Sequence, residues 1–296
     1  MKPTVGFLGL GAMGSVMAAN LARIGFPLWI YNRTRSKADA VADQIGAHIA
    51  SSPSELARNV QTVFTMVSDA QALHGLYFAS HGLTEGLQPG TICVEMSTIG
   101  PRAVIELEEK LRPTGCHLLD SPVSGSIALA RDAGLTVMVG GLAEDLTRVR
   151  PMLDAMAKSV FHVGPVGSGA AMKLSINTII FGLNQAVAEG LIFAESVGIA
   201  RALAYDVIES SAVAAPFVHY RRDAFLQEHD VPVGFSLQLA QKDLELIEIA
   251  AGRNQAFLPQ TSINRQVVSD AIAAGFGAED VTAVASYLRE VPHRHS

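Results

Sequence analysis

Apolar residues in the first half of the chain gather in short runs that are rich in Val, Ile, Leu and Phe. Such runs predict β-strands, here at Thr4–Gly9, Pro27–Tyr31, Val60–Val67, Thr91–Met96, His117–Asp120 and Leu135–Gly140. The segments between them mix Ala, Glu and Lys and predict helices, among them Arg35–Gln44, Ala103–Leu111 and Ala143–Ala157. Strands that alternate with helices predict a parallel, doubly wound α/β sheet with crossover helices.

The pattern changes after residues 161–165. From Gly167 onwards the apolar spacing predicts helices and no strand, at about residues 168–197, 201–213, 217–227, 236–253, 260–274 and 278–288. Glycine and proline mark the breaks between them, at Gly198, Pro216, Pro232, Gly234, Pro259 and Gly275. The sequence therefore predicts two domains, an α/β domain at residues 1–164 and an all-α domain at residues 165–296, with a long helix joining them.

Composition and charge narrow the class of protein. With 296 residues, 49% of them apolar, and a net charge of −6, the chain is typical of a soluble globular protein. A nucleic-acid partner is not expected, because phosphates are bound by a basic face. The N-terminal residues run directly into a strand without the pattern of a leader peptide, so we expect a cytoplasmic protein.

The most apolar long segment, Leu174–Ala194, raises the question of a membrane span. It is interrupted by Asn177, Asn184, Gln185 and Glu189. Polar residues at that spacing predict a buried helix and no membrane association. The two cysteines, Cys93 and Cys116, fall in apolar segments and are expected to act as small hydrophobic residues without a disulfide.

A glycine-rich turn follows the first predicted strand. It consists of Gly9, Leu10, Gly11, Ala12, Met13 and Gly14. The G-x-G-x-x-G pattern between a strand and a helix is typical of a dinucleotide-binding Rossmann domain. Gly9 permits the tight turn, Gly11 lets the pyrophosphate approach, and Gly14 lets the helix pack closely against the sheet. The helix start then points free N–H groups at the anion.

The end of the second strand indicates which dinucleotide is bound. An NAD enzyme usually has Asp or Glu at this point to accept hydrogen bonds from the ribose. This chain has Asn32, Arg33 and Thr34 instead, with Lys37 nearby. A guanidinium attracts a 2′-phosphate that a carboxylate would repel. We therefore expect NADP (as NADPH) as the cofactor, and the alternative is an exposed basic turn without a ligand.

Two polar residues lie on one face of the long predicted helix. Lys173 and Asn177 are four residues apart in an otherwise apolar stretch that opens with Gly167 and Gly169. A lysine on a buried surface has a lowered pKa and becomes suited to proton transfer. A lysine whose stem packs while its ammonium reaches water fits the same spacing, and spacing alone favours this second interpretation.

Four motifs together resemble the β-hydroxyacid dehydrogenase family. They are Gly9–Gly14, Asp120-Ser-Pro-Val-Ser124-Gly125-Ser126, Gly167-x-Gly169-x-x-x-Lys173-x-x-x-Asn177, and Lys242-Asp243. This family includes 3-hydroxyisobutyrate dehydrogenases, tartronate semialdehyde reductases and glyoxylate/succinic semialdehyde reductases. The likeness extends from residue 4 to about residue 288, and four motifs in order are far more specific than one.

The resemblance implies roles for the residues that match. Lys173 is similar to the family's catalytic lysine, which gives a proton to the carbonyl oxygen during reduction, and Asn177 to a residue that helps to hold the substrate. Ser124 and Gly125 match the loop that binds the substrate carboxylate, where Ser126 replaces a common glycine.

Further positions match segments around the nicotinamide. Thr98, with Ser97, corresponds to a segment that lines both nicotinamide and substrate. Lys242 and Asp243 match a pair near the nicotinamide end of the site, and Phe235 an aromatic residue that closes the pocket. On the residues alone, structural alternatives stay open: a helix cap at Ser97-Thr98, a solvated pair at Lys242-Asp243 and a core position for Phe235.

The implied activity is NADPH-dependent interconversion of a small carboxylate-bearing aldehyde, of the semialdehyde or glyoxylate type, and its hydroxyacid. Within the family, the residues at positions 69 and 126, Asp69 and Ser126, resemble those of the glyoxylate/succinic semialdehyde reductases more than those of the 3-hydroxyisobutyrate dehydrogenases. The family also implies a homodimer or homotetramer. No metal is expected, since the nine histidines are dispersed along the chain.

Four alternatives can be compared with these motifs. A 3-hydroxyisobutyrate dehydrogenase proper shares the motifs, and imine reductases share the architecture but generally replace the lysine. The 6-phosphogluconate dehydrogenases usually carry a histidine where this chain has Ile176, and a much longer helical domain. From a different class, a non-catalytic dinucleotide-binding module would bind the cofactor without oxidising it in the presence of an aldehyde.

Overall fold

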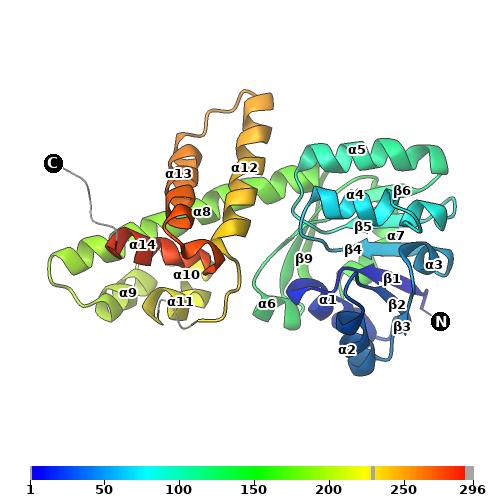
Figure 1. Cartoon of the computed structure of the whole chain (residues 1–296), viewed down its shortest axis with the longest axis horizontal. Helices are drawn as coiled ribbons and strands as arrows, with labels where there is room; N and C mark the ends of the chain where they lie inside the picture. The colour runs from blue at the N-terminus through cyan, green and yellow to red at the C-terminus, as the bar shows by residue number, and fades with distance from the viewer. Residues whose placement is uncertain (1, 228–230, 291–296) are drawn as a thin grey trace. The chain divides into compact units, whose positions relative to one another are not determined.

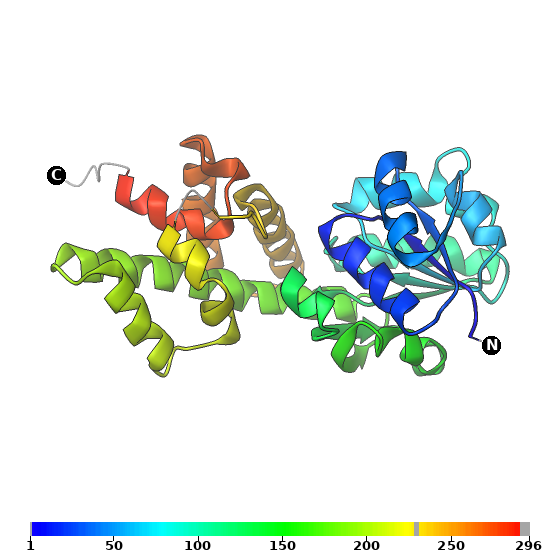
Figure 2. The same ribbon diagram turned by 90° about the horizontal axis from the view of Figure 1, so that it is seen from below.

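The computed structural model describes residues 2–227 and 231–290. The chain divides into two compact units, residues 1–173 and 174–296. The division falls nine residues after the boundary expected at residue 164, because the first turns of the long helix α8 (Ser168–Ser196) pack with the first unit. Figure 1 shows both units, and Figure 2 shows α8 in light green as one uninterrupted helix.

The first unit contains a nine-stranded sheet with the order β3-β2-β1-β4-β5-β6-β8-β7, and β9 pairs with β8. Its strands are β1 (Val5–Leu8), β2 (Leu28–Tyr31), β3 (His48–Ile49), β4 (Thr62–Thr65), β5 (Ile92–Glu95), β6 (His117–Asp120), β7 (Val123–Ser124), β8 (Leu135–Gly140) and β9 (Ala157–Gly164). Its helices are α1 (Ala12–Arg23), α2 (Arg35–Ile45), α3 (Pro53–Arg58), α4 (Ala70–Phe78), α5 (Pro101–Leu111), α6 (Ile127–Arg131) and α7 (Ala143–Leu153). The predicted Rossmann fold is confirmed.

Period-two alternation along the strands explains why helices cover both faces of the sheet. In β1, Val5 and Phe7 join the core under α1, α2, α6 and α7, whereas Leu8 joins the core under α3, α4 and α5. In β5, Val94 and Cys93 divide in the same way. Figure 1 shows α1 and α2 on one side of the strands and α4 and α5 on the other.

The sheet departs from the prediction at one edge. Six strands from β3 to β6 are parallel, but β8 runs antiparallel to β6, and β9 runs parallel to β8. The sequence pattern missed β3, β7 and β9. The helix expected at Ala143–Ala157 ends at Leu153, and Ala157 begins β9. Buried and exposed side chains do not alternate along β9, where Phe161 is 56% exposed. This strand is therefore recognised by its pairing with β8 and not by its sequence pattern.

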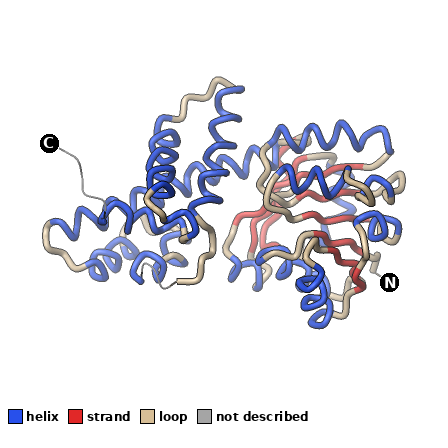
Figure 3. The backbone as a smooth tube through the Cα atoms, in the orientation of Figure 1, coloured by secondary structure: helices blue, strands red, loops and turns tan. Residues whose placement is uncertain are grey.

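The second unit is helical, as expected. It holds the rest of α8 with α9 (Arg201–Ser210), α10 (Pro216–Tyr220), α11 (Arg222–Gln227), α12 (Leu237–Arg253), α13 (Pro259–Ala273) and α14 (Val284–Glu290), and short 3-10 turns at Phe276–Ala278 and Val281–Ala283. Figure 3 shows the strands in red in the first unit, and among residues 174–227 and 231–290 the structure has helices and loops with one isolated bridge, Ser236 to Asp280. The single helix expected at 217–227 is two helices.

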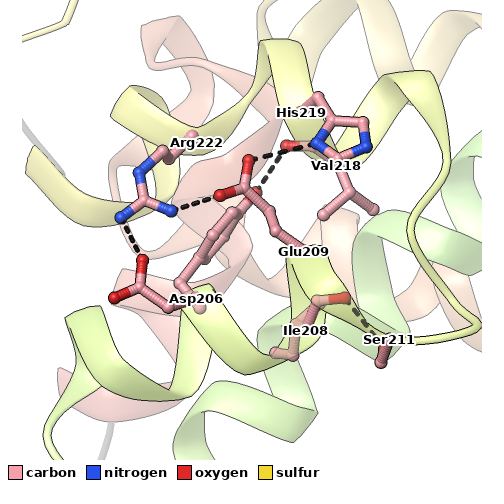
Figure 4. A network of polar contacts seen from close by, with 8 residues as sticks. Asp206, Ile208, Glu209, Ser211, Val218, His219 and Arg222 are labelled. Carbon is pink, nitrogen blue, oxygen red and sulfur yellow. Dashed lines mark hydrogen bonds and ion pairs between the residues drawn. The ribbon is translucent and has the colours of Figure 1, made fainter.

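A polar network joins α9 to α10 and α11 (Figure 4). Arg222 binds both Glu209 and Asp206, and the Tyr205 hydroxyl donates to the Val218 carbonyl at 2.8 Å. His219 contacts Glu209 at 3.4 Å. These contacts fix α10 against α9, with Val218 in the helical core.

Helix α8 is long and apolar enough, by length and composition, to cross a membrane, a test that the core helix of a soluble protein also passes. Its polar residues have internal partners: Asn184 donates to the Val281 carbonyl at 3.0 Å, and Gln185 to Glu189 at 2.7 Å. Leu174, Phe181 and Leu191 lie in the helical core. These contacts favour the predicted buried helix.

Candidate active site

Two of the three glycines in the turn after β1 are required by the protein itself. Gly9 has a φ of +93°, and a Cβ there would lie 2.1 Å from the Met66 carbonyl oxygen. A Cβ on Gly14 would lie 2.0 Å from the Gly9 carbonyl oxygen. A Cβ on Gly11, in contrast, meets no heavy atom within 4 Å. Gly11 therefore borders open space, as a residue that admits a ligand does.

Helix α1 starts directly at this open position. Gly11 precedes it and has no side chain to cap the first-turn N–H groups, which include those of Ala12 and Met13. Uncapped N–H groups at a helix start attract an anion such as a pyrophosphate. The glycine turn and the start of α1 thus fit the diphosphate of a nicotinamide dinucleotide.

In the segment after β2, Asn32 and Arg33 have different surroundings. The Asn32 side chain accepts a hydrogen bond from Leu10 N at 3.0 Å and donates one to the Thr34 carbonyl at 3.0 Å. Asn32 is therefore a brace between the glycine turn and β2. Arg33 is exposed, and no ion pair involves it among the residues that the structure describes, whereas Arg35 pairs with Asp39 at 2.9 Å.

The segment after β5 is fixed by hydrogen bonds to a buried carboxylate. Glu95, 1% exposed, accepts hydrogen bonds from Ser97 N at 2.7 Å and from the Thr65 hydroxyl. The Ser97 hydroxyl accepts one from Val67 N at 2.7 Å. These bonds tie the ends of β4 and β5 together and leave Thr98 half-buried beside them. Gly100 occupies the N-cap position of α5, the helix that follows.

The proposed carboxylate loop follows β6. Ser124 is half-buried and ends β7, which pairs with β8. Gly125 has a φ of +143°, a conformation that side-chain-bearing residues rarely adopt. The Ser126 hydroxyl caps α6 by accepting from Leu129 N at 3.2 Å. Ser126, which stands where the family commonly has glycine, therefore caps a helix. Asp69 similarly caps α4, accepting from Ala72 N at 2.7 Å.

All of these segments lie at one edge of the sheet. Strands β1, β2, β4, β5 and β6 are parallel neighbours, so their carboxyl ends point the same way. The strand order reverses between β1 and β4, and ligands of open α/β sheets bind at the carboxyl edge beside such a reversal. The glycine turn, Arg33, Thr98 and Ser124 follow strands that end at this edge.

Lys173 lies on the second turn of α8 and is half-buried. One turn further along the same helix, the Asn177 amide donates to Asp243 Oδ2 at 2.8 Å. Asp243 Oδ1 forms an ion pair with Lys242 Nζ at 3.1 Å. Asn177 and Asp243 are both buried. Lys242 and Asp243 are therefore a partly buried ion pair that fixes Asn177, and the solvated pair considered from the sequence is excluded.

Phe235 belongs to the helical core. Its ring stacks on Phe181 with the centroids 6.2 Å apart, and it packs against the buried residues of the second unit. Its flanking backbone is fixed as well, since Phe235 N donates to Asp280 at 3.2 Å. This is the packing expected of the core alternative, and a role for Phe235 in closing a pocket stays a prediction.

Two buried carboxylates were not singled out from the sequence. Glu95 and Asp120 end β5 and β6 and are paired in register across the sheet. Burial raises the pKa of Glu95 to about 7 and that of Asp120 to about 6. An acid that ends an otherwise apolar strand was the available signal. Cys93 and Cys116 are buried and free, as expected. Among residues 2–227 and 231–290, no cluster of His, Cys, Asp or Glu could hold a metal ion.

Two family models match consecutive parts of the chain. The NAD binding domain of 6-phosphogluconate dehydrogenase matches residues 4–164, and the NAD-binding domain of NADP-dependent 3-hydroxyisobutyrate dehydrogenase matches residues 167–288. The chain belongs to the β-hydroxyacid dehydrogenase family. The chain is therefore an oxidoreductase with a nicotinamide dinucleotide as its cofactor.

Three relatives illustrate the range of the family. Glyoxylate/succinic semialdehyde reductase 2 of Arabidopsis thaliana is 31% identical over 99% of this chain and 81% of its own. The NAD-dependent L-serine dehydrogenase of Pseudomonas aeruginosa is 31% identical over 95% of this chain and 96% of its own. The structure of Mycobacterium tuberculosis 3-hydroxyisobutyrate dehydrogenase with L-serine is 30% identical, has a TM-score of 0.85, and covers 98% of this chain and 100% of its own.

Proposed function

We propose that this β-hydroxyacid dehydrogenase reduces a small carboxylate-bearing aldehyde, of the semialdehyde or glyoxylate type, to its hydroxyacid with NADPH. Lys173 is the general acid of this reaction, and the general base of its reverse. The observation that carries the proposal is the arrangement on α8. Lys173 precedes by one turn an asparagine whose amide is fixed by a buried carboxylate at 2.8 Å. This arrangement supports Lys173 as a proton donor with the fixed amide of Asn177 one helical turn away.

Lys173 has one proton to move. When bound, the nicotinamide supplies the hydride to the carbonyl carbon. The ammonium of Lys173 stabilises the negative charge that develops on the carbonyl oxygen and then donates its proton to that atom. General acid catalysis of this kind contributes on the order of 10²- to 10⁴-fold to the rate. In the oxidation direction, the neutral amine takes the hydroxyl proton.

The loop after β6 orients the substrate. The Ser124 hydroxyl and the backbone N–H groups of Gly125 and Ser126 offer donors to a carboxylate. The Ser126 hydroxyl accepts from Leu129 N, and its own O–H remains a donor beside the backbone N–H. A carboxylate held at one end leaves the aldehyde carbon in a defined place, which reduces the entropic part of the barrier.

Arg33 selects NADPH over NADH in this proposal. It follows the second strand, where it is exposed and, within the described part of the chain, unpaired by any acid. Its guanidinium can bind the 2′-phosphate with two parallel hydrogen bonds. Relatives that use NAD exist, and Arg33 is the residue on which the preference rests.

The helical unit supports assembly with further copies of the chain. Ile179 and Phe193 of α8 are each 70% exposed, and Val207 of α9 is 61% exposed. Apolar side chains exposed in this number favour burial against a second copy. We therefore propose a homodimer or homotetramer. We also place the protein in the cytoplasm, since its two free, buried cysteines suit a reducing compartment.

NADPH oxidation against a panel of short aldehydes tests the activity: glyoxylate, succinic semialdehyde, tartronate semialdehyde and methylmalonate semialdehyde. Lys173→Ala is expected to lower kcat at least 100-fold while the Kd for NADPH changes little. Lys158→Ala, at an exposed lysine of β9, is the matched control and retains wild-type kcat. If Lys173→Ala kept substantial kcat, the general-acid assignment would be wrong.

The same assay separates the alternatives. Faster oxidation of 3-hydroxyisobutyrate or L-serine than reduction of any aldehyde would identify a dehydrogenase of the kind found in the Mycobacterium and Pseudomonas relatives. Turnover of cyclic imines alone would identify an imine reductase-like enzyme. Tight NADPH binding with no turnover of any compound would indicate a non-catalytic dinucleotide-binding module.

A further inference from the structure

The first turn of α8 lacks a cap of its own. Gly167, the residue before the helix, has no side chain that could accept from the first-turn N–H groups. These groups cannot be satisfied within the helix, and buried N–H groups without partners are costly. Some other part of the fold must therefore supply the acceptor.

Asp120 supplies it from the end of β6. Its Oδ1 accepts from Gly167 N at 2.9 Å, and its Oδ2 accepts from Ala170 N at 2.7 Å. The side chain is completely buried. A carboxylate at a helix start also interacts favourably with the helix dipole. One acid thus satisfies two N–H groups that lie 47 and 50 residues further along the chain.

Two glycines make room for this contact. A Cβ on Gly169 would lie 2.3 Å from the Asp120 carbonyl oxygen and 2.5 Å from that of Met138. A Cβ on Gly140 would lie 2.3 Å from Asp120 Oδ1. Neither glycine has a positive φ, so close approach, and not backbone conformation, requires them. The helix start is pressed directly onto the ends of β6 and β8.

We propose that Asp120 is a positioning residue, which fixes the first turn of α8 and thereby the place of Lys173 relative to the carboxylate loop. The proposal rests on the proposed function of Lys173. Lys173 stands three residues after Ala170 on the same helix, and Ser124 stands four residues after Asp120. The Asp120 side chain therefore connects the helix that carries Lys173 to the strand that precedes the loop with Ser124.

The carboxylate is specifically required for this role. Both of its partners are backbone N–H donors, so each oxygen must accept. In Asp120→Asn one acceptor becomes an NH₂ group that faces a donor. Burial raises the pKa of Asp120 to about 6, so the side chain is ionised at neutral pH and above.

Steady-state kinetics and hydrogen exchange of Asp120→Asn at pH 8 test the proposal. We expect kcat to fall at least 10-fold, the KM for NADPH to change less than 2-fold, and amide exchange in residues 166–172 to rise at least 10-fold. The matched control is Asp145→Asn. Asp145 is equally buried, but it contacts His117, at the opposite end of β6, at 2.7 Å. It is expected to keep wild-type kcat and wild-type exchange in residues 166–172.

Wild-type kcat in Asp120→Asn, or an equal loss of kcat in Asp145→Asn, would overturn the proposal. If Lys173→Ala were active as well, the proposed function would fail too, whereas an inactive Lys173→Ala beside a fully active Asp120→Asn would overturn the positioning role alone. Should Asp120→Asn not fold, the wild-type protein gives the second test. The Ala170 amide is expected to exchange at least 10-fold more slowly than the first-turn amide of Met13, which has no side-chain cap; equal rates would refute the assignment.

Discussion

Asn177 donates its side-chain amide to Asp243 Oδ2 at 2.8 Å across 66 residues of sequence, and both side chains are buried in the helical unit. Lys242 balances the charge of this carboxylate from the neighbouring position, at 3.1 Å from Oδ1. A carboxylate so placed is favourable only while both partners remain, because a buried charge without partners is strongly destabilising.

Asp243→Ala should therefore lower the free energy of unfolding by about 2–4 kcal/mol, since it leaves the Asn177 amide without its acceptor. Urea unfolding followed by circular dichroism measures the change. The control is Asp206→Ala, which breaks an ion pair with Arg222 at a side chain that is 57% exposed, and should cost at most about 1 kcal/mol. Equal losses in the two variants would contradict the role of burial.

Arg33 and Arg35 provide a matched pair for cofactor preference. Arg33→Ala should raise the Kd for NADPH about 10- to 100-fold, the value of one charge-assisted bidentate contact, and leave the Kd for NADH nearly unchanged. Arg35→Ala removes an arginine that already pairs with Asp39 at 2.9 Å, and should leave both constants within about 2-fold. Fluorescence titration with the two cofactors measures them, and a parallel rise for NADPH and NADH in Arg33→Ala would refute phosphate recognition.

Substitutions of Gly11 and Gly14 should affect different properties, cofactor binding for Gly11 and stability for Gly14. Gly11→Ala adds a methyl group to open space, so we expect wild-type thermal stability and a loss of at least about 10-fold in NADPH affinity, because the backbone can no longer approach the pyrophosphate. Gly14→Ala places a methyl group 2.0 Å from the Gly9 carbonyl oxygen, so it should lower stability by about 1–3 kcal/mol through overpacking. Unchanged NADPH binding in Gly11→Ala would place the cofactor elsewhere.

Glu95 should make the protein less stable as pH rises. Burial raises its pKa from 4.5 to about 7, so between these values the folded state binds more protons than the unfolded state. The stabilisation from this extra proton is complete below pH 4.5 and is lost as pH rises through 7, by an amount on the order of 3 kcal/mol.

Glu95→Gln tests this directly. Its carbonyl can accept from Ser97 N, and its NH₂ group can donate to the Thr65 hydroxyl, so both contacts survive without charge. We expect stability close to wild type at pH 5 and about 3 kcal/mol above wild type at pH 8. Glu144→Gln, at an exposed position of α7, is the control and should follow the wild-type profile. A Gln variant that loses stability at pH 8 would refute the prediction.

Local pattern predicted the strands that are buried on both faces, and the structure places β6 and β8 at the residues expected. It could not predict β7, which is two residues long, or β9, where Phe161 is exposed. Such strands are defined by hydrogen bonds to β8, and a pairing partner is a tertiary property. The sequence likewise does not show that the Asn32 and Ser126 side chains accept hydrogen bonds from Leu10 N and Leu129 N, because these contacts depend on the fold.

The sequence by itself determined the two-domain organisation, the glycine turn, Arg33 after the second strand and the Lys173–Asn177 spacing. These features are encoded within a few residues of one another, where helical and strand periodicity and backbone sterics act. Only the tertiary structure shows which backbone and side-chain groups Asp120 and Glu95 contact. The partners of Asp120 lie at the start of α8, Glu95 accepts from Thr65 of β4, and burial is the largest cause of the raised pKa values of both carboxylates. A residue's identity is local, but its solvent exposure and its hydrogen-bond partners depend on the whole fold.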